Sequence, residues 1–235
     1  MGDKQESAGS FMISHFHEFK IGDTTLYITS THISMVIVSL VLIIFAIAVN
    51  RKIKAADESE TPGTLQNIGE LAVEMLINMV NGIMGPSGPK FFNYIATLFM
   101  FTALSNISGL FGLRPPTADY GVTLLLGIVT FCLIQYNGIK KNKISHFTSL
   151  FQPVWFLFPI NLIGELAVPV SLSLRLFGNV MSGTVIMGLL YGLLKPFTVA
   201  WPAALHIYFD IFSGCIQAYV ISMLTMVYIS DKVND

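Results

Sequence analysis

ISMVIVSLVLIIFAIAV, the stretch Ile33–Val49, contains no charged side chain. A helix needs about 20 apolar residues to cross a bilayer core about 30 Å thick, because each residue rises about 1.5 Å. The stretch is nearly that long, and it is followed by the basic residues Arg51, Lys52 and Lys54. It therefore predicts a membrane-spanning helix over residues 31–50.

The composition of the whole chain agrees with a membrane protein. Of the 235 residues, 53% are hydrophobic and 11% are charged, whereas a soluble domain carries about 25% charged residues. We therefore expect a lipid bilayer to be the solvent for much of the surface. The net charge of -1 gives no indication of nucleic-acid binding. Cys132 and Cys215 stand alone in apolar runs, so we expect buried thiols rather than a disulfide or a metal site.

Four further apolar segments follow the first one: about Phe91–Leu113, Gly121–Tyr136, Phe151–Leu194 and Phe197–Ile229. Basic clusters follow the first and third spans, and the positive-inside rule places such clusters in the cytoplasm. We expect an all-α polytopic membrane protein with five crossings, its N-terminus outside and its C-terminus cytoplasmic. Its single membrane domain, 1–235, would comprise an outward-facing segment (1–30), the first span (31–50), an interfacial helix (64–84), the second and third spans (90–137) and a tilted hairpin (150–230).

The interfacial helix is predicted from apolar residues spaced three and four apart between the first two spans. They are Leu65, Ile68, Ala72, Met75, Leu76, Met79 and Ile83. Polar residues, among them Glu70 and Glu74, lie elsewhere around the helix. We expect an amphipathic helix at the cytoplasmic interface, ended sharply by Gly85-Pro86-Ser87-Gly88-Pro89.

The last two apolar segments are unusually long. As continuous helices of about 44 and 33 residues they would measure roughly 66 and 50 Å, well beyond the thickness of the bilayer core. Either these helices break, or they lie steeply tilted. Lys195-Pro196 is the expected turn between them, because proline does not continue a helix.

Arg175 is the most informative residue of the first long segment. An arginine at bilayer depth costs between about 2.5 and 17 kcal/mol, and its guanidinium does not deprotonate to avoid that cost. It should therefore face a carboxylate or water, unless it reaches the interface or pairs with Glu165. Ser171, Asn179 and Ser182 share its helical face.

A second polar stripe lies on the last segment, formed by His206, Asp210, Ser213 and Gln217. If the turn centres near Pro196, Arg175 and Gln217 each lie about 21 residues from it. The two would then sit side by side in an antiparallel hairpin, and Thr184 would fall near Asp210. An intramembrane carboxylate is by default a functional candidate.

Glycines also lie along the first long segment, at Gly164, Gly178, Gly183 and Gly188. Small residues let membrane helices approach closely. These glycines would pack either against the other arm of the hairpin or against a separate ring of helices. Sequence alone leaves both alternatives open.

The motifs SLSLRLFGN (Ser171–Asn179) and IQAYVISMLTMVYIS (Ile216–Ser230) closely resemble subunit a of the rotary F-type ATP synthases. A segment that the family carries on the outer side of the membrane is resembled by Pro116-Thr117-Ala118-Asp119, followed by Val122-Thr123. The resemblance covers most of the chain from about residue 90 onward, and the arginine motif is highly specific.

The resemblance implies a stator that is not itself an enzyme and that forms two offset half-channels to a rotating ring of c subunits. Peripheral-stalk b subunits and, indirectly, the catalytic head would be further partners, in a bacterial cell membrane. The essential arginine of the family maps to Arg175, with Asn179, Gln217 and Glu165 as further pathway residues. Some members carry glutamate at the position of Thr184 and histidine at the position of Asp210. In this chain the carboxylate therefore lies on the last helix and not on the one before it.

Two other classes of protein are alternatives. A secondary transporter often shows internal repeats with broken helices, and the sequence shows no convincing repeat. An intramembrane enzyme would need a nucleophile and a base at plausible spacing, which the sequence does not offer. It also lacks a GxxxxGK[ST] phosphate loop and an HExxH zinc motif, so no cofactor is expected.

Overall fold

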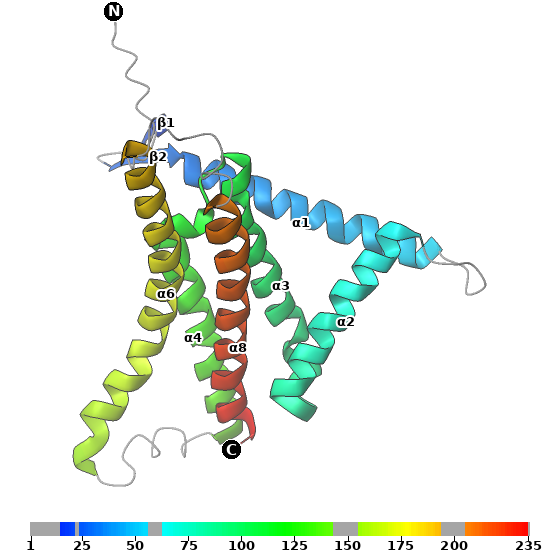
Figure 1. Ribbon diagram of the computed structural model, residues 1–235. Helices are drawn as coiled ribbons and strands as arrows, with labels where there is room; N and C mark the ends of the chain where they lie inside the picture. The colour runs from blue at the N-terminus through cyan, green and yellow to red at the C-terminus, as the bar shows by residue number, and fades with distance from the viewer. Residues whose placement is uncertain (1–14, 22–23, 56–62, 143–154, 194–204, 235) are drawn as a thin grey trace, which may run out of the picture.

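The computed structural model describes residues 15–21, 24–55, 63–142, 155–193 and 205–234. A β-hairpin is followed by a bundle of long helices (Figure 1). The long elements are β1 (His15–Ile21), β2 (Thr24–Thr29), α1 (Ser30–Ala55), α2 (Thr64–Met84), α3 (Gly88–Ile107), α4 (Tyr120–Asn142), α6 (Phe158–Leu193), the π-helical η6 (Ile207–Ser213) and α8 (Gly214–Asn234). Short 3-10 turns are η1 (Gly85–Ser87), η2 (Ser108–Phe111), η3 (Pro116–Ala118) and η4 (Trp155–Leu157).

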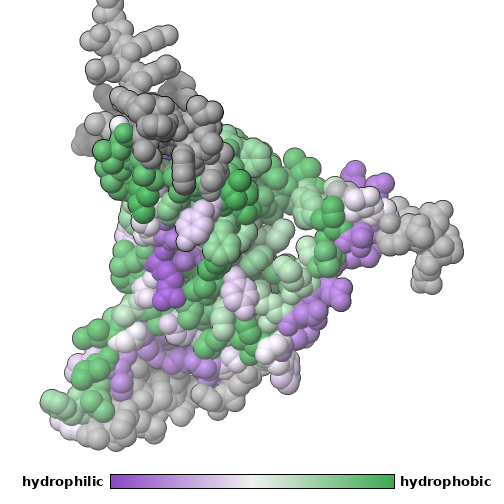
Figure 2. Space-filling model, viewed as in Figure 1, coloured by the Kyte–Doolittle hydropathy of each residue, from purple (hydrophilic) through white to green (hydrophobic). Residues whose placement is uncertain are grey.

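The prediction of an all-α polytopic membrane protein is confirmed. Among the described residues, 5 helical segments are long and apolar enough to cross a membrane: Ser30–Lys54, Gln66–Phe111, Tyr120–Lys141, Trp155–Leu190 and Ile207–Val233. Large apolar side chains are exposed along these segments, for example Ile44 at 64% and Leu189 at 62%. Figure 2 shows the resulting hydrophobic surface. Such a surface suits lipid and not water.

The N-terminal β-hairpin is a feature that the sequence did not lead us to expect. β1 and β2 pair antiparallel, with Glu18 opposite Tyr27 and Lys20 opposite Thr25. Both strands are rich in the aromatic and β-branched residues that favour extended structure. The hairpin leads directly into α1 at Ser30.

The helix α2 begins and ends where the apolar spacing predicts. Gly85 ends it with a φ of 55°, a left-handed conformation that glycine adopts without strain. Its inner side buries Leu76, Val80 and Met84. Two members of the predicted apolar stripe do not lie on this buried side, because Ile68 and Met75 are 53% and 59% exposed.

That exposure follows from the position of α2 at the edge of the bundle, where α1 and α3 cover only one side of it (Figure 1). The buried stripe is therefore narrower than the stripe of apolar residues in the sequence. The placement of α2 at a membrane interface stays a prediction.

The core lies where α2, α3, α4 and α8 meet. Its fully or nearly fully buried members are Val80, Met84, Phe91, Ile95, Ile134, Met226 and Ile229. The packed faces of α3 and α8 also carry small polar residues, and Thr102, Ser105, Ser222 and Thr225 are all 0% exposed. Small and weakly polar residues are typical of helix interfaces in membranes, because they allow close backbone approach.

The two long helices that follow form the predicted antiparallel pair, with α6 running opposite to η6 and α8 (Figure 1). α6 has 36 residues, or about 54 Å. It bends along its length in Figure 1 and contains Pro169, which removes one hydrogen bond from the helix. The predicted turn at Lys195-Pro196 lies outside the described residues.

One expectation about the thiols is wrong. Cys132 and Cys215 are free but exposed rather than buried. They lie on the outer faces of α4 and α8, where the neighbouring exposed residues are also apolar. Because lipid tails are as apolar as the protein core, an apolar side chain of a membrane protein is equally stable on the surface and in the core.

Candidate functional site

The register between α6 and the last helical segment fits the predicted hairpin. The hydroxyl of Ser213 donates a hydrogen bond of 3.0 Å to Oδ1 of Asn179. One turn further along α6, a Cβ atom added at Gly183 would lie 3.5 Å from Phe209. Both pairs are symmetric about position 196. One helical turn before Asn179, the same register brings Arg175 to the level of Gln217.

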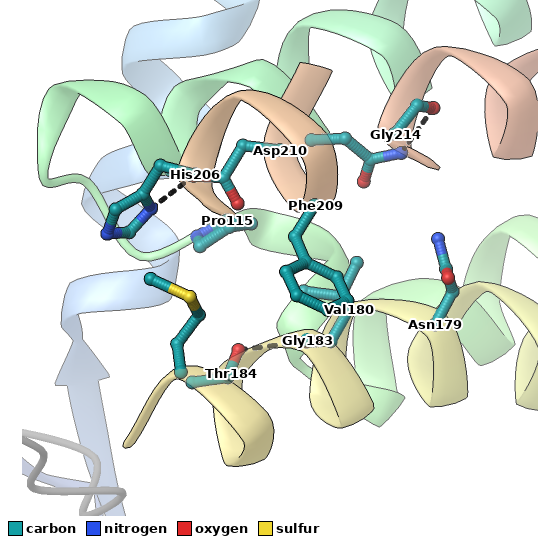
Figure 3. Close-up of a pocket in the computed structure, with 12 residues that line it drawn as sticks. Pro115, Asn179, Val180, Gly183, Thr184, His206, Phe209, Asp210 and Gly214 are labelled. Carbon is teal, nitrogen blue, oxygen red and sulfur yellow. Dashed lines mark hydrogen bonds and ion pairs between the residues drawn. The ribbon is translucent and has the colours of Figure 1, made fainter. Parts of the chain in front are cut away.

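A cavity of about 170 Å³ lies between these helices and the C-terminal end of α3 (Figure 3). Thr184 and Asp210 both line it, as the register predicts. The complete lining is Asn106, Gly109, Pro115, Asn179, Val180, Gly183, Thr184, Met187, His206, Phe209, Asp210 and Gly214. Because a water molecule needs only about 15 Å³ of such space and several polar partners, this cavity has room for water or for a hydrated ion.

The charged group of the cavity is Asp210 on η6. Its Oδ2 lies 2.8 Å from Nδ1 of His206, one turn earlier. The side chains of His206 and Asp210 are 37% and 22% exposed. A Cβ atom added at Gly109 in η2 would lie 3.3 Å from the carboxylate of Asp210. The carboxylate is thus held between its own helix and a close backbone, with the remaining side open to the cavity (Figure 3).

Two buried polar residues near Asp210 did not emerge as site residues from the sequence. Nδ2 of Asn106 donates a hydrogen bond of 3.0 Å to the carbonyl oxygen of Gly214. The hydroxyl of Thr117 donates one of 2.8 Å to Oδ1 of Asn106. A lone asparagine within an apolar segment was the available signal, since such residues are rare and usually hydrogen-bonded.

The guanidinium-bearing face of α6 points away from the rest of the chain. Arg175 is exposed, and so are Ser171 and Ser182 on the same face. Within the described part of the chain, Arg175 has no hydrogen bond or ion pair. The alternative in which Arg175 pairs with Glu165 is therefore wrong for this structure.

Gln217 lies at the same level on α8 but is 8% exposed. Its Nε2 has no hydrogen-bond partner among the described residues. An unpartnered buried amide costs about 1–3 kcal/mol. Gln217 thus keeps a free donor at the level of the arginine.

Glu165 forms a separate polar cluster at the other end of α6. Its Oε1 accepts a hydrogen bond of 2.6 Å from Nζ of Lys232, and its Oε2 accepts one of 2.8 Å from Nε2 of Gln135. These contacts join α4, α6 and α8. Glu165 and Thr184 therefore lie on opposite sides of Arg175, ten residues before it and nine after it.

Of the two alternatives for the glycines of α6, packing against the other arm of the hairpin is seen at Gly183, and packing against a separate ring of helices stays a prediction. Gly183 packs against Phe209 of the adjacent arm of the hairpin. A Cβ atom added at Gly164 or Gly178 would meet nothing within 4 Å. Gly164 and Gly178 therefore lie on a side of α6 that the other described residues do not cover. This side is open to a partner.

Fold and site together define a class: a polytopic helical membrane protein in which an antiparallel pair of long helices carries polar groups at bilayer depth and an exposed arginine. The family model described as ATP synthase A chain matches residues 32–230. The chain therefore belongs to the ATP synthase A chain family.

Individual relatives agree with the family. The chain is 39% identical over 191 residues to "ATP synthase subunit a, sodium ion specific" of Propionigenium modestum, covering 74% of this chain and 65% of that protein. It is 35% identical over 221 residues to "ATP synthase subunit a" of Moorella thermoacetica, covering 92% and 95%. A third, "ATP synthase subunit a" of Lysinibacillus sphaericus, is 32% identical over 222 residues, covering 88% and 92%.

Family membership places the chain in the membrane sector of an F-type ATP synthase, as part of that complex and in a role of ion translocation. The five apolar helical segments make it a multi-pass membrane protein. The sequence resemblance to this family is thereby confirmed.

Proposed function

We propose that this chain is the stator half of the ion path, and that Arg175 faces the ion-binding carboxylate of a rotating ring of c subunits. The observation that carries the proposal is the exposure of Arg175 without an ionic partner among the described residues. A cation at bilayer depth is costly unless a carboxylate or water faces it. A ring carboxylate on another chain meets that requirement as it passes.

The positive charge supplies the chemistry of ion release. A neighbouring cation favours the ionised form of a carboxylate, so a ring carboxylate loses its ion beside Arg175. The same fixed charge repels cations that would otherwise pass directly between the two sides. The ring must then turn for ions to cross, and each unit charge contributes about 2.3 kcal/mol per 100 mV.

Two polar sites on opposite sides of Arg175 support two offset half-channels. The cavity at Thr184 and Asp210 lies on one side of it, with Asn179 at its edge. The cluster at Glu165, which includes Lys232, lies on the other. Along α6 the two sites are separated by about 19 residues, or about 28 Å, close to the thickness of a bilayer core. Gln217 and Ser171 lie between them on the path.

The remaining partners follow from the same proposal. Peripheral-stalk b subunits would hold the chain still against the ring, and the catalytic head would carry the ATP chemistry, so the chain itself is not an enzyme. The basic residues after α1 and at the end of α4 support an orientation with the N-terminus outside a bacterial cell membrane and the C-terminus in the cytoplasm.

The proposal is tested with Arg175→Ala in the complete complex, reconstituted in vesicles. ATP synthesis driven by an ion gradient should be abolished while the complex still assembles. Arg51→Ala, at the exposed end of α1, removes an arginine away from the hairpin and should retain synthesis. Normal coupled synthesis in the Arg175→Ala complex would overturn the assignment.

A further inference from the structure

We propose that Asn106 and Thr117 are positioning residues for Asp210, because they fix the π-helical segment η6 against the C-terminal end of α3. The inference rests on the proposed function of Asp210 in the outer half-channel. It assigns a task to two buried side chains that need not touch the ion.

The contact is a chain of hydrogen bonds that joins three elements. Thr117 of η3 donates to Asn106 of α3 at 2.8 Å, and Asn106 donates to the carbonyl of Gly214 at 3.0 Å. Thr117 is 0% exposed and Asn106 is 4% exposed. Gly214 follows η6 immediately, so the chain of bonds ends at the junction of the π-helix and α8.

Gly214 and Thr117 together satisfy the amide of Asn106. An amide presents an accepting oxygen on one side and donating hydrogens on the other. Because the carbonyl of Gly214 only accepts, it requires Nδ2 on its side, and Oδ1 is left to face the hydroxyl of Thr117, which donates to it. Without that hydroxyl, the buried Oδ1 loses its partner and the amide is held at one end only, which weakens the contact to Gly214.

Two glycines show how closely the elements approach. A Cβ atom added at Gly214 would lie 2.8 Å from the Cβ atom of Asn106, a distance that real side chains do not adopt. A Cβ atom added at Gly109 would lie 3.3 Å from the carboxylate of Asp210. The backbones of η2 and η6 are therefore held closer than larger residues permit, and the hydrogen bonds of Asn106 lie at this contact.

The geometry matters because Asp210 belongs to the π-helical part. π-helical turns are rare and less regular than α-helical ones, and they occur frequently at functional sites. A segment of this kind needs tertiary contacts to keep its register. If η6 returned to α-helical spacing, Asp210 would rotate with respect to Gly214 and away from its present place in the cavity (Figure 3).

The direct side-chain contact of the carboxylate is with His206, whose Nδ1 lies 2.8 Å from Oδ2 of Asp210. Among the residues that line the cavity, His206 and Asp210 are the titratable ones. The groups that face Asp210 from η2, α3 and α6, including Gly109, Asn106 and Thr184, are uncharged. Because His206 lies one turn earlier on the same helical segment, the position of Asp210 in the cavity depends on the backbone that carries both residues.

The first experiment compares Thr117→Val, Thr117→Ser and Thr102→Val in the complete complex. Valine keeps the shape of threonine without the hydroxyl, and serine keeps the hydroxyl. Thr102 is an equally buried control on α3, whose hydroxyl bonds only to carbonyls of its own helix at 2.7 and 3.1 Å. ATP synthesis is measured against the concentration of the driving ion outside, with proton and sodium gradients in turn.

Thr117→Val should raise the outside ion concentration for half-maximal synthesis by roughly ten-fold, the consequence of one buried hydrogen-bonding group left unpaired. The rate at saturating ion should stay near that of the unchanged complex. Thr117→Ser and Thr102→Val should leave both quantities unchanged. An unchanged half-saturating concentration in Thr117→Val would overturn the proposal, and so would a loss of maximal rate shared with Thr102→Val.

A second measurement does not depend on ion transport. Amide hydrogen exchange over residues 207–214 of the assembled complex should quicken in Thr117→Val but not in Thr102→Val. Asn106→Leu, which keeps a similar side-chain size but has neither the donor to Gly214 nor the acceptor for Thr117, should behave like Thr117→Val and serves if that variant fails to assemble. Equal exchange in all variants would contradict the inference. Coupled synthesis in Arg175→Ala would instead contradict the proposed function.

Discussion

The carboxylate of Asp210 lines the cavity between α6 and η6, and its surroundings give a test at the scale of one residue. Asp210→Asn keeps the size of the side chain and removes the charge that attracts a cation. Ion-driven ATP synthesis should slow several-fold without uncoupling, because Arg175 is still in place. The measurement is the ratio of ATP made to ions moved, together with the rate.

Asp231→Asn is the matched control, since Asp231 is exposed near the end of α8. It should change neither the rate nor the ratio. If Asp210→Asn matched this control at every ion concentration, Asp210 would have only a structural role.

Residue spacing predicted some of this site and not the rest. The distance of Asp210 and Thr184 from Pro196 was enough to bring them together, because an antiparallel pair of helices keeps one register along its length. The contact of Asn106 with Gly214 spans 108 positions and follows no period. It depends on how η2 and η3 fold back over η6, which local spacing does not encode.

At the scale of elements, the packing of α4 against α6 depends on Gly127. A Cβ atom added there would lie 2.6 Å from the carbonyl oxygen of Pro169, which is backbone and does not move aside easily. Gly127→Ala should therefore destabilise the subunit by about 1–3 kcal/mol, as overpacking does. The loss should appear as a lower temperature of irreversible aggregation of the purified complex.

Gly82→Ala provides the comparison, because nothing lies within 4 Å of a Cβ atom at Gly82. Both glycines are helical, so alanine improves helix propensity at both by roughly 1 kcal/mol. Gly82→Ala should leave the aggregation temperature unchanged or slightly raised. Equal behaviour of the two variants would show that α4 and α6 have room to move apart.

The cluster that joins α4, α6 and α8 gives a second test of the elements. Lys232→Gln removes the cation 2.6 Å from Glu165, while Gln135 remains. Because both charged side chains are partly exposed, at 27% and 21%, the expected loss of stability is only about 1 kcal/mol. Lys232→Arg should restore most of it, as judged by the same aggregation temperature.

Lys141→Gln, at the exposed end of α4, controls for the loss of a positive charge near the same side of the molecule. It should have no effect on stability. A loss as large as that in Lys232→Gln would point to overall charge and not to the ion pair.

The element boundaries also separate what sequence predicts from what it does not. Uncharged runs such as Ile33–Val49 predicted the spans, because few alternatives bury so many apolar residues. The hairpin of β1 and β2 was missed because those strands lie outside any long apolar run. The π-helical turn of η6 was missed because its residues fit a regular helix equally well, and tertiary contact decides between the two.

The orientation of the whole molecule is open to a direct test. Lys52→Cys and Thr25→Cys are made separately in a chain with Cys132→Ser and Cys215→Ser. By the positive-inside rule, a membrane-impermeant thiol reagent should label residue 52 only from the cytoplasmic side and residue 25 only from the outside. Labelling of residue 52 from the outside would reverse the proposed orientation.

The last helix completes the core of the bundle, and this has a consequence for biosynthesis. Met226 and Ile229 of α8 pack in one cluster with Val80 and Phe91, which leave the ribosome more than 130 residues earlier. Until α8 arrives, the cluster of α2, α3 and α4 lacks the members that Met226 and Ile229 supply, and the small polar face of α3 with Thr102 and Ser105 lacks the helix that covers it. The nascent chain must therefore hold an unfinished core in the membrane until its last helix has been made.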